Sequence, residues 1–557
     1  MKKNITILSI FIFIFISNLN LYCNTNLFSA NSTVYIEFCK NKAMIQNIYS
    51  DMVNKNKDIN EIELGFIQNN KFYYIKDYIK EIDYIKGTNI IKITALKEGI
   101  KFEINIYTPF DANKESFFIT TDIITEEIKF NTNIKLVYNI KSDKTGNVYW
   151  NKWSKLYSFN KLNLKSIVND SDIFITNNQK KFDNKLLKSK GSIKKKINND
   201  ISIVVNKGNL ESYNSIREIL MISFSAIDRE FVNNLPTHYI LNQEISHWNY
   251  WHNKSDKNDL YKNDELLIKQ ITILKMLQIN NEKILSHSIP NSSTYDVEST
   301  LYTTYALIKT GHYNEAKKII LKLLDEKNIN LMKNNNDDNL GLFLLVFSEY
   351  LNESKDFTIF NENYFSIQEN ILEYIYEKYN NSELIITKNE LKKLYYISKG
   401  IKSLLEKTSY LISKEVVLDY LQITCKINNS INKFNEYSYK DIIIVDKDIV
   451  SEDKIELINK TYFQKYLKSL ETKDDKEIFT ENLLDTAIAL YNCDKVEEFN
   501  LITNYIDDII YKNSMLIPNS FCIKNKDIAI KDDKIRAINL SKYIIIKNVG
   551  VINANNK

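Results

Sequence analysis

Two acidic residues stand one residue apart at the end of a polar loop, where their carboxyl groups could cap a helix or bind a ligand. The loop reads SIPNSSTYDVEST over residues 288–300 and places Asp296 and Glu298 directly before an apolar-periodic segment. An Asp at this place accepts hydrogen bonds from free backbone N–H groups, and a Glu in the first turn suits the helix dipole. The same carboxylates, beside the ring of Tyr295, could instead line the floor of a binding site. Both interpretations stay open, and they are compatible.

A pair of tryptophans forms a second candidate site, because aromatic rings are favourable platforms for the C–H faces of sugars. Trp248 and Trp251 are three residues apart in the stretch WNYW. A helix would place both rings on one face. Rings in a connector also serve for packing, so a binding platform and a packing pair remain the two alternatives.

These candidates lie where the hydrophobic period of the chain changes. Before residue 228, short runs rich in Ile, Tyr, Phe, Val and Thr alternate with polar residues, which is typical of antiparallel strands. From residue 260 onward, apolar residues recur at helical spacing in segments joined by mostly short connections. We expect an antiparallel β-sandwich at 31–235, a connector at 236–259 and a helical domain at 260–557. Serial helices form an open solenoid or a closed ring, and the lack of a fixed repeat disfavours the solenoid.

The composition excludes several classes of protein. A chain of 557 residues that is 44% hydrophobic exceeds one ordinary core. The 74 basic and 70 acidic residues nearly balance, which argues against nucleic acid as a partner. The five cysteines are widely spaced, and neither they nor the five histidines form a metal-ligand motif. We therefore expect no disulfide framework, no metal and no cofactor.

The N-terminus has the pattern of an export signal. Lys2 and Lys3 precede the apolar run 7–16, which is shorter than the roughly 20 residues of a membrane span. We expect residues 1–30 to direct export to the periplasm or the cell surface. Cleavage after Ala30 and lipid attachment at Cys23 are both compatible with the pattern, and the second would tether the protein to a membrane. An uncleaved anchor is the remaining alternative.

The order of sandwich, Trp-rich connector and helices resembles bacterial glucoamylase-like glycoside hydrolases of family fifteen, which include trehalose-cleaving members. Similarity at the level of motifs covers residues 248–318, from the WNYW stretch to a helix that ends at Gly311 and is followed by Glu315-Ala316. The resemblance implies a ring of six helical hairpins, an (α/α)6 barrel, with a sugar site at one end. It also implies that an α-linked glucoside is bound by Trp248, Trp251, Tyr295, Asp296 and Glu298.

The residues that this family uses for chemistry are only partly present. Its Arg-Asp pair, which holds hydroxyls of the terminal glucose, corresponds to Val297 and Glu298, and valine offers no hydrogen-bond donor. An inverting glycosidase needs an acid and a base whose carboxyl groups are roughly 6.5–9.5 Å apart. Glu383 and Glu390 flank the place of the acid. Asn519 stands at the place of the base, and an amide is not an effective base.

Two functions follow from this comparison. The first is a glycoside hydrolase of the glucoamylase or trehalase type, which cleaves α-linked glucosides by acid/base inversion with Glu390 or Glu383 as the proton donor. The second is an inactive relative that serves as an exported glycan-binding or surface interaction protein. The absent arginine and the absent late glutamate favour the second, because function depends on the site and not on the fold.

Overall fold

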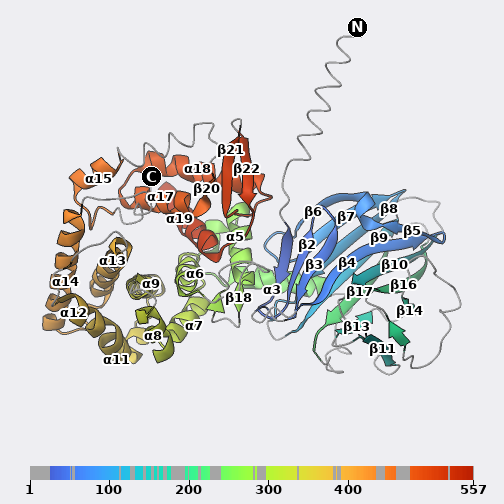
Figure 1. Cartoon of the computed structure of the whole chain (residues 1–557), viewed down its shortest axis with the longest axis horizontal. Helices are drawn as coiled ribbons and strands as arrows, with labels where there is room; N and C mark the ends of the chain where they lie inside the picture. The colour runs from blue at the N-terminus through green and yellow to red at the C-terminus, as the bar shows by residue number, and fades with distance from the viewer. Residues whose placement is uncertain are drawn as a thin grey trace, which may run out of the picture. The chain divides into compact units, whose positions relative to one another are not determined.

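The computed structural model divides the chain into two compact units (Figure 1). The first comprises Asn26–Lys254 with Ile271–Thr294, and the second comprises Ser255–Gln270 with Tyr295–Lys557. The structure describes residues 26–50, 52, 57–111, 114–125, 132–141, 146–151, 156–159, 162–166, 172–176, 195–197, 200–210, 215–225, 240–279, 283–284, 296–334, 338–380, 384, 390–434, 446–459, 477–524 and 527–555.

Two large antiparallel sheets make up the first unit in the described part of the chain. One sheet has the order β1 (Leu27–Ala30), β2 (Tyr35–Cys39), β3 (Met44–Tyr49), β4 (Lys57–Gln68), β10 (Thr132–Lys141), β16 (Asp200–Leu210), β14 (Asp172–Thr176), with β5 (Lys71–Tyr74) also paired to β4. The other has the order β15 (Lys195–Ile197), β11 (Gly146–Asn151), β12 (Leu156–Phe159), β13 (Leu162–Ser166), β17 (Ser215–Ser223), β9 (Ser116–Thr125), β8 (Ile100–Tyr107), β7 (Ile91–Lys97), β6 (Ile79–Tyr84).

The two sheets share one core. In β7, the side chains of Ile91, Ile93 and Ala95 are buried and alternate with more exposed neighbours, as the period of a strand requires. The rings of Phe66 in β4 and Phe102 in β8 lie 4.6 Å apart, so the inner faces of the sheets meet. The prediction of an antiparallel β region before a helical region is confirmed.

Helix α3 (Ile240–Asn253) and the small hairpin of β18 (Gln278–Ile279) and β19 (Lys283–Ile284) also belong to the first unit, and α5 (Glu265–Met276) contributes residues to both units. The second unit contains α4 (Asn258–Tyr261), α6 (Val297–Lys309), α7 (Tyr313–Leu323), α8 (Glu326–Asn334), α9 (Asp338–Ser354), α10 (Thr358–Glu362), α11 (Tyr364–Ile367), α12 (Glu373–Asn380), α13 (Leu391–Thr408), α14 (Lys414–Lys433), α15 (Glu452–Ile458), α17 (Thr480–Asn492), α18 (Val496–Lys512) and α19 (Ala537–Asn555), with a small sheet of β20 (Ile478–Phe479), β21 (Ser520–Lys524) and β22 (Asp527–Asp532).

Five of these helices form the interior of the second unit, and we call them the core helices. Helix α17 packs on α19, α19 on α6, α6 on α9, and α9 on α13 (Figure 1). Helix α6 is buried on nearly all sides, whereas α7, which follows it, buries only one stripe of residues. Helices α14 and α18 likewise follow and pack on α13 and α17. Core helices therefore alternate along the chain with helices that have one wet face.

Two glycines allow α9 and α13 to approach each other closely. A Cβ atom added to Gly341 would lie 2.3 Å from the backbone nitrogen of Ile397. A Cβ atom added to Gly400 would lie 2.3 Å from the carbonyl oxygen of Gly341. Both distances are far below a carbon contact, and the obstacle is rigid backbone in each case. The crossing of these two core helices thus requires residues without a side chain.

We expect Gly400→Ala to lower the free energy of unfolding by about 1–3 kcal/mol, because the added methyl group must push two packed helices apart. Alanine favours an isolated helix over glycine by about 1 kcal/mol, so the expected sign is opposite to that of helix propensity. Urea unfolding followed by circular dichroism measures the change. The control is Glu406→Ala on the exposed side of α13, for which we expect less than about 0.5 kcal/mol. A Gly400→Ala protein as stable as the parent would contradict the close packing.

Candidate functional site

Asp296 caps the first core helix. Its carboxylate accepts hydrogen bonds from the backbone N–H of Ser299 at 3.0 Å and from the Ser299 hydroxyl at 2.6 Å. These bonds satisfy an N–H group that has no partner within the helix. Of the two interpretations of Asp296, the cap is therefore present, and it fixes the point where α6 begins. Tyr295, the residue before it, lies outside the described residues.

Trp248 and Trp251 pack inside the first unit. They are 2% and 4% exposed, and their ring centroids lie 5.9 Å apart in an edge-on contact. The Trp248 indole N–H lies 3.1 Å from both the Asn89 side-chain oxygen and a carboxylate oxygen of Glu244. A ring that is buried and hydrogen-bonded in this way offers no face to a sugar. The packing alternative thus describes both tryptophans.

Glu390, one of the two residues predicted as proton donors, lies at the start of α13. Glu390 is half-buried at the N-cap position, and its carbonyl oxygen accepts a hydrogen bond from the Leu394 N–H at 2.9 Å. Its side chain does not cap the helix. Glu383 lies outside the described residues. Catalysis by Glu390 or Glu383 stays a prediction.

Charged residues from four core helices meet at the N-terminal ends of these helices, and we call them the ion-pair cluster. Glu298, Lys392 and Glu481 are each the second residue of their helix, in α6, α13 and α17. The remaining members come from the second turn of α17 and from the start of α19. The ion-pair cluster consists of Glu298, Lys392, Glu481, Asp485, Arg536 and Lys542.

Each carboxylate of the ion-pair cluster contacts a cation. The Lys392 ammonium lies 2.6 Å from the Glu298 carboxylate, and the Arg536 guanidinium lies 2.6 Å from the Glu481 carboxylate. The Lys542 ammonium lies 3.2 Å from Glu481 and 2.5 Å from Asp485. The Lys542 side chain is 0% exposed, whereas the other members are between 23% and 35% exposed. The cluster therefore has a buried floor and a solvent-facing rim.

The cations set the protonation of the two carboxylates on α17. Burial by itself raises the pKa of Glu481, but the charges of Lys542 and Arg536 outweigh it and lower that pKa to about 2. Burial also raises the pKa of Asp485, and Lys542 offsets only part of this effect. Opposite shifts on neighbouring carboxyl groups are the pattern of an acid/base pair. Here, however, both groups contact one buried ammonium, that of Lys542.

Several buried polar atoms beside the ion-pair cluster have no hydrogen-bond partner among the described residues. Asn539 is 0% exposed, and both its side-chain oxygen and its side-chain nitrogen are unpaired. It lies three residues from both Arg536 and Lys542, so it shares their face of α19. The Arg536 Nε and the hydroxyl of Thr480, at the start of α17, are also unpaired. Buried polar groups of this kind normally bind water or a ligand.

Asn519, at the place predicted for the base, forms hydrogen bonds with both β22 and the start of α17. Its side-chain N–H donates to the Asp532 carboxylate at 2.8 Å, and its carbonyl oxygen accepts from the Thr480 N–H at 3.0 Å. The Asn519 side-chain oxygen is buried and has no hydrogen-bond partner among the described residues. The chain thus places an amide here and a carboxylate, Asp532, directly beside it.

Sequence reasoning found Glu298 but missed the rest of the ion-pair cluster. Glu481 and Asp485 are four residues apart at the start of a helix, which resembles an ordinary solvated first turn. Lys542 lies in the predominantly apolar α19. A lysine inside an apolar segment was the one feature of the sequence that could have indicated a buried charge. Asn539 carried no signal at all.

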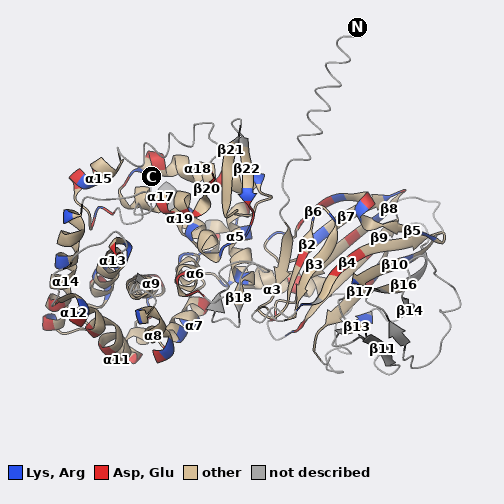
Figure 2. Ribbon diagram, viewed as in Figure 1, with Lys and Arg blue, Asp and Glu red and all other residues tan. Residues whose placement is uncertain are grey.

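Charged residues of both signs are spread over the described part of the chain. Figure 2 shows acidic and basic residues interspersed, without one large patch of either sign. In the described part of the chain, His, Cys, Asp and Glu side chains form no group of three or more that could hold a metal ion. Across the same residues, no helix is both long enough and apolar enough to span a membrane.

Comparisons with known proteins give a likeness of fold and no likeness of sequence. No protein-family model matches the chain. No curated protein matches it either. A bacterial glucoamylase complexed with acarbose superposes with a TM-score of 0.61 at 9% identity, over 96% of this chain and 94% of the glucoamylase. A family 92 α-mannosidase from Bacteroides thetaiotaomicron in complex with mannoimidazole covers 94% of this chain and 82% of its own at 9% identity, with a TM-score of only 0.36. The first likeness confirms the resemblance to glucoamylases at the level of fold.

We expect Glu244→Gln to stabilise the first unit at alkaline pH. Burial raises the pKa of Glu244 to about 7, although hydrogen bonds from the Phe110 backbone and the Trp248 indole act in the opposite direction. A raised pKa on an acid favours folding below the unfolded pKa of about 4.3, and that stability is lost as the pH rises through 7. Glutamine is neutral at every pH and keeps an oxygen for the indole N–H.

The measurement is the free energy of unfolding by tryptophan fluorescence at pH 5 and pH 8. The Glu244→Gln protein should gain up to about 3 kcal/mol relative to the parent at pH 8 and much less at pH 5. Glu81→Gln, at an exposed position of β6, is the control and should show no such pH dependence. An equal effect of Glu244→Gln at both pH values would show that Glu244 is not protonated in the fold.

We expect Lys542→Met to destabilise the second unit by about 3–5 kcal/mol at pH 7, because it leaves two carboxylates without their shared cation. Lys392→Met removes the cation of an ion pair that is about one-third exposed. It should lower the free energy of unfolding by at most about 1 kcal/mol. Urea unfolding at pH 7 and pH 3 measures both. In the variant, Glu481 and Asp485 lack Lys542 and take up protons more readily. The difference in the free energy of unfolding between Lys542→Met and the parent should therefore be smaller at pH 3 than at pH 7. Equal costs for the two variants would contradict the difference in burial.

Proposed function

We propose that this protein is a carbohydrate-binding relative of glycoside hydrolases, and that it binds an α-linked glucoside at the rim of the ion-pair cluster. In this proposal, the core helices and the helices that follow them close into an (α/α)6 ring, with the sugar site at the N-terminal ends of the core helices. The fold shared with a glucoamylase that was solved with acarbose supports the ligand class. The N-terminal sequence pattern supports export, so the binding would take place in the periplasm or at the cell surface.

The chemistry of the rim suits a neutral, hydroxyl-rich ligand. Glu298, Lys392 and Arg536 are each about one-third exposed, and they alternate acceptors with donors. A sugar hydroxyl both donates and accepts, so it can pair with either kind of group. Asn539 and the Arg536 Nε are buried and have no hydrogen-bond partner among the described residues, so they add hydrogen-bonding atoms beneath the exposed rim. Asp296 contributes by fixing the start of α6 and hence the position of Glu298.

The pairing of the carboxylates carries the proposal of binding without efficient hydrolysis. A general acid must hold a proton at the working pH, and the pKa of Glu481 is about 2. Asp485 keeps its proton more readily, but it contacts the buried Lys542. At the place of the base stands Asn519, whose amide cannot take up a proton from water. These features make fast acid/base inversion chemically unfavourable.

Slow inverting hydrolysis of an α-linked glucoside is the second candidate function. One observation favours it: Glu390 begins α13, two residues from Lys392 of the rim, and Asp532 lies beside Asn519. In this alternative, Glu390 or Glu383 would donate a proton to the leaving oxygen. Asp532 would activate water, and the two carboxyl groups would have to be roughly 6.5–9.5 Å apart.

Acarbose is the probe for binding, measured by isothermal titration calorimetry with the full chain. We expect binding to the parent protein and a loss of affinity of about tenfold in Arg536→Lys, which keeps the charge but removes the planar fork of donors. Lys447→Ala changes an exposed ion pair with Asp494 outside the site, and it should bind like the parent. Absence of acarbose binding, or equal losses in both variants, would refute the proposed site.

Glucose release from maltose, isomaltose and trehalose decides between the two functions. We expect release no faster than in a sample without protein. Release that disappears in Glu390→Gln, Glu383→Gln or Asp532→Asn would establish the second candidate instead. Circular dichroism of each variant shows whether a loss of activity reflects a loss of folding.

A further inference from the structure

A pocket of about 90 Å³ lies among the helices of the second unit, and one of its lining residues, Tyr491, is 38% exposed. This cavity is bounded by the core helices α6, α9, α13, α17 and α19 and by Phe499 of α18. Tyr302 separates it from the cluster: the Lys542 ammonium lies 5.0 Å from the centre of the Tyr302 ring, and the Tyr302 hydroxyl is hydrogen-bonded to that of Tyr396. The cavity is thus distinct from the rim to which we assign the sugar.

The wall of the cavity is apolar over most of its surface and polar at one end. Apolar side chains come from α9, α17, α18 and α19: Leu342, Leu345, Ile488, Phe499, Ile545 and Ile546. The polar end is formed by Lys399, Tyr395 and Asn492. Such a combination of an apolar body and a few convergent polar groups is typical of sites for small molecules.

Lys399 offers a hydrogen bond to a ligand. Its ammonium lies 2.5 Å from the Asp446 carboxylate and 3.1 Å from the Tyr395 hydroxyl. An ammonium has three N–H donors, so one remains for an oxygen atom inside the cavity. Tyr305, on α6, also lines the pocket, and its hydroxyl is a second polar group there.

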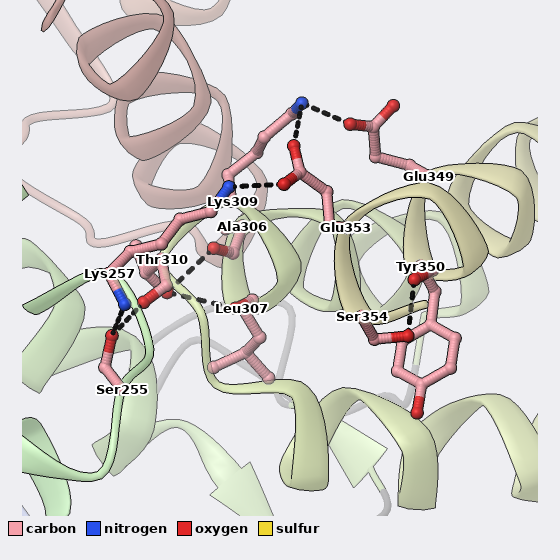
Figure 3. Close-up of polar contacts among 10 residues, drawn as sticks. All are labelled: Ser255, Lys257, Ala306, Leu307, Lys309, Thr310, Glu349, Tyr350, Glu353 and Ser354. Atoms are coloured by element: carbon pink, nitrogen blue, oxygen red, sulfur yellow. Dashed lines mark hydrogen bonds and ion pairs between the residues drawn. The ribbon is translucent and has the colours of Figure 1, made fainter. Parts of the chain in front are cut away.

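The charges around the cavity cancel, which disfavours an ionised ligand. Asp446 is 4% exposed and balances Lys399. The Lys309 ammonium lies against the Tyr305 ring. It forms ion pairs with Glu349 and Glu353, and Glu353 is also paired with Lys257 (Figure 3). An anion placed here would lose its hydration and face a buried carboxylate, at a high cost in free energy. A neutral oxygen acceptor avoids that cost.

We propose that this cavity is a second binding site, which takes a neutral short-chain molecule with one oxygen acceptor, such as an alcohol, aldehyde or ketone. The oxygen accepts the free N–H of Lys399, and the carbon chain lies against Ile545 and Ile546. An engineered protein cavity of about 150 Å³ binds benzene, so the present volume suits a ligand of about four non-hydrogen atoms. The site is independent of sugar binding, because the Tyr302–Tyr396 pair closes it toward the rim.

The test uses 2-fluoroethanol, a neutral alcohol with four non-hydrogen atoms, and follows its fluorine NMR line width with the full chain. We expect broadening with a dissociation constant in the millimolar range, as the small size of the ligand dictates. Fluoroacetate, a charged molecule of similar size, should not broaden. Unlabelled 1-propanol should compete with 2-fluoroethanol, whereas acarbose should not.

A matched pair of variants locates the binding. Leu345→Phe fills the cavity from α9 and should weaken binding at least tenfold. Leu321→Phe makes the same change at a position of α7 that is 39% exposed, and it should bind like the parent. Tyr305→Phe removes one hydroxyl without changing the shape of the wall, and it should weaken binding less than Leu345→Phe does. The proposal is overturned if 2-fluoroethanol does not bind, if fluoroacetate binds as well, or if folded Leu345→Phe protein binds like Leu321→Phe.

Discussion

The buried ammonium of Lys542 is the interaction on which the rest of the second unit depends. An ammonium without water contact is tolerated only when anions surround it, and Glu481 and Asp485 of α17 supply them. Because these residues lie on different helices, the requirement for charge balance fixes α17 against α19. Lys542 acts to lower the pKa of both carboxyl groups, but burial leaves the pKa of Asp485 raised, whereas Lys542 and Arg536 together lower that of Glu481.

The packing of the other core helices brings further charges to the same end. Glycines at the crossing of α9 and α13 allow these helices to lie close, and α6 lies between α9 and α19. The cap at Asp296 decides where α6 begins, so Glu298 falls in its first turn. First turns carry unpaired N–H groups and the positive end of the helix dipole, which favours acidic residues there. Glu298 and Glu481 follow this local preference, whereas the cations of the ion-pair cluster are brought beside them by the packing of the helices.

The fold and the site carry different kinds of information about function. The chain shares its fold with a bacterial glucoamylase over nearly its whole length, at 9% identity. A shared fold places a pocket, but a reaction requires groups with suitable protonation and room for a substrate. Here the carboxylates are paired with cations, and an amide stands at the place that the sequence predicted for the base. Among the core helices, the second unit nevertheless contains a pocket with a polar end of its own.

The sequence by itself determined the order of a β region followed by helices, because the hydrophobic period of two or of 3.6 residues is a local property. It also predicted a cap at the start of this helix, with Asp296 among the candidates, since capping acts over three residues. Only the tertiary structure decided which charges meet, because Glu298, Lys392, Glu481 and Lys542 are far apart in the chain and no periodicity relates them. It also decided that Trp248 and Trp251 are buried, since a spacing of three residues places two rings on one face without saying what covers that face.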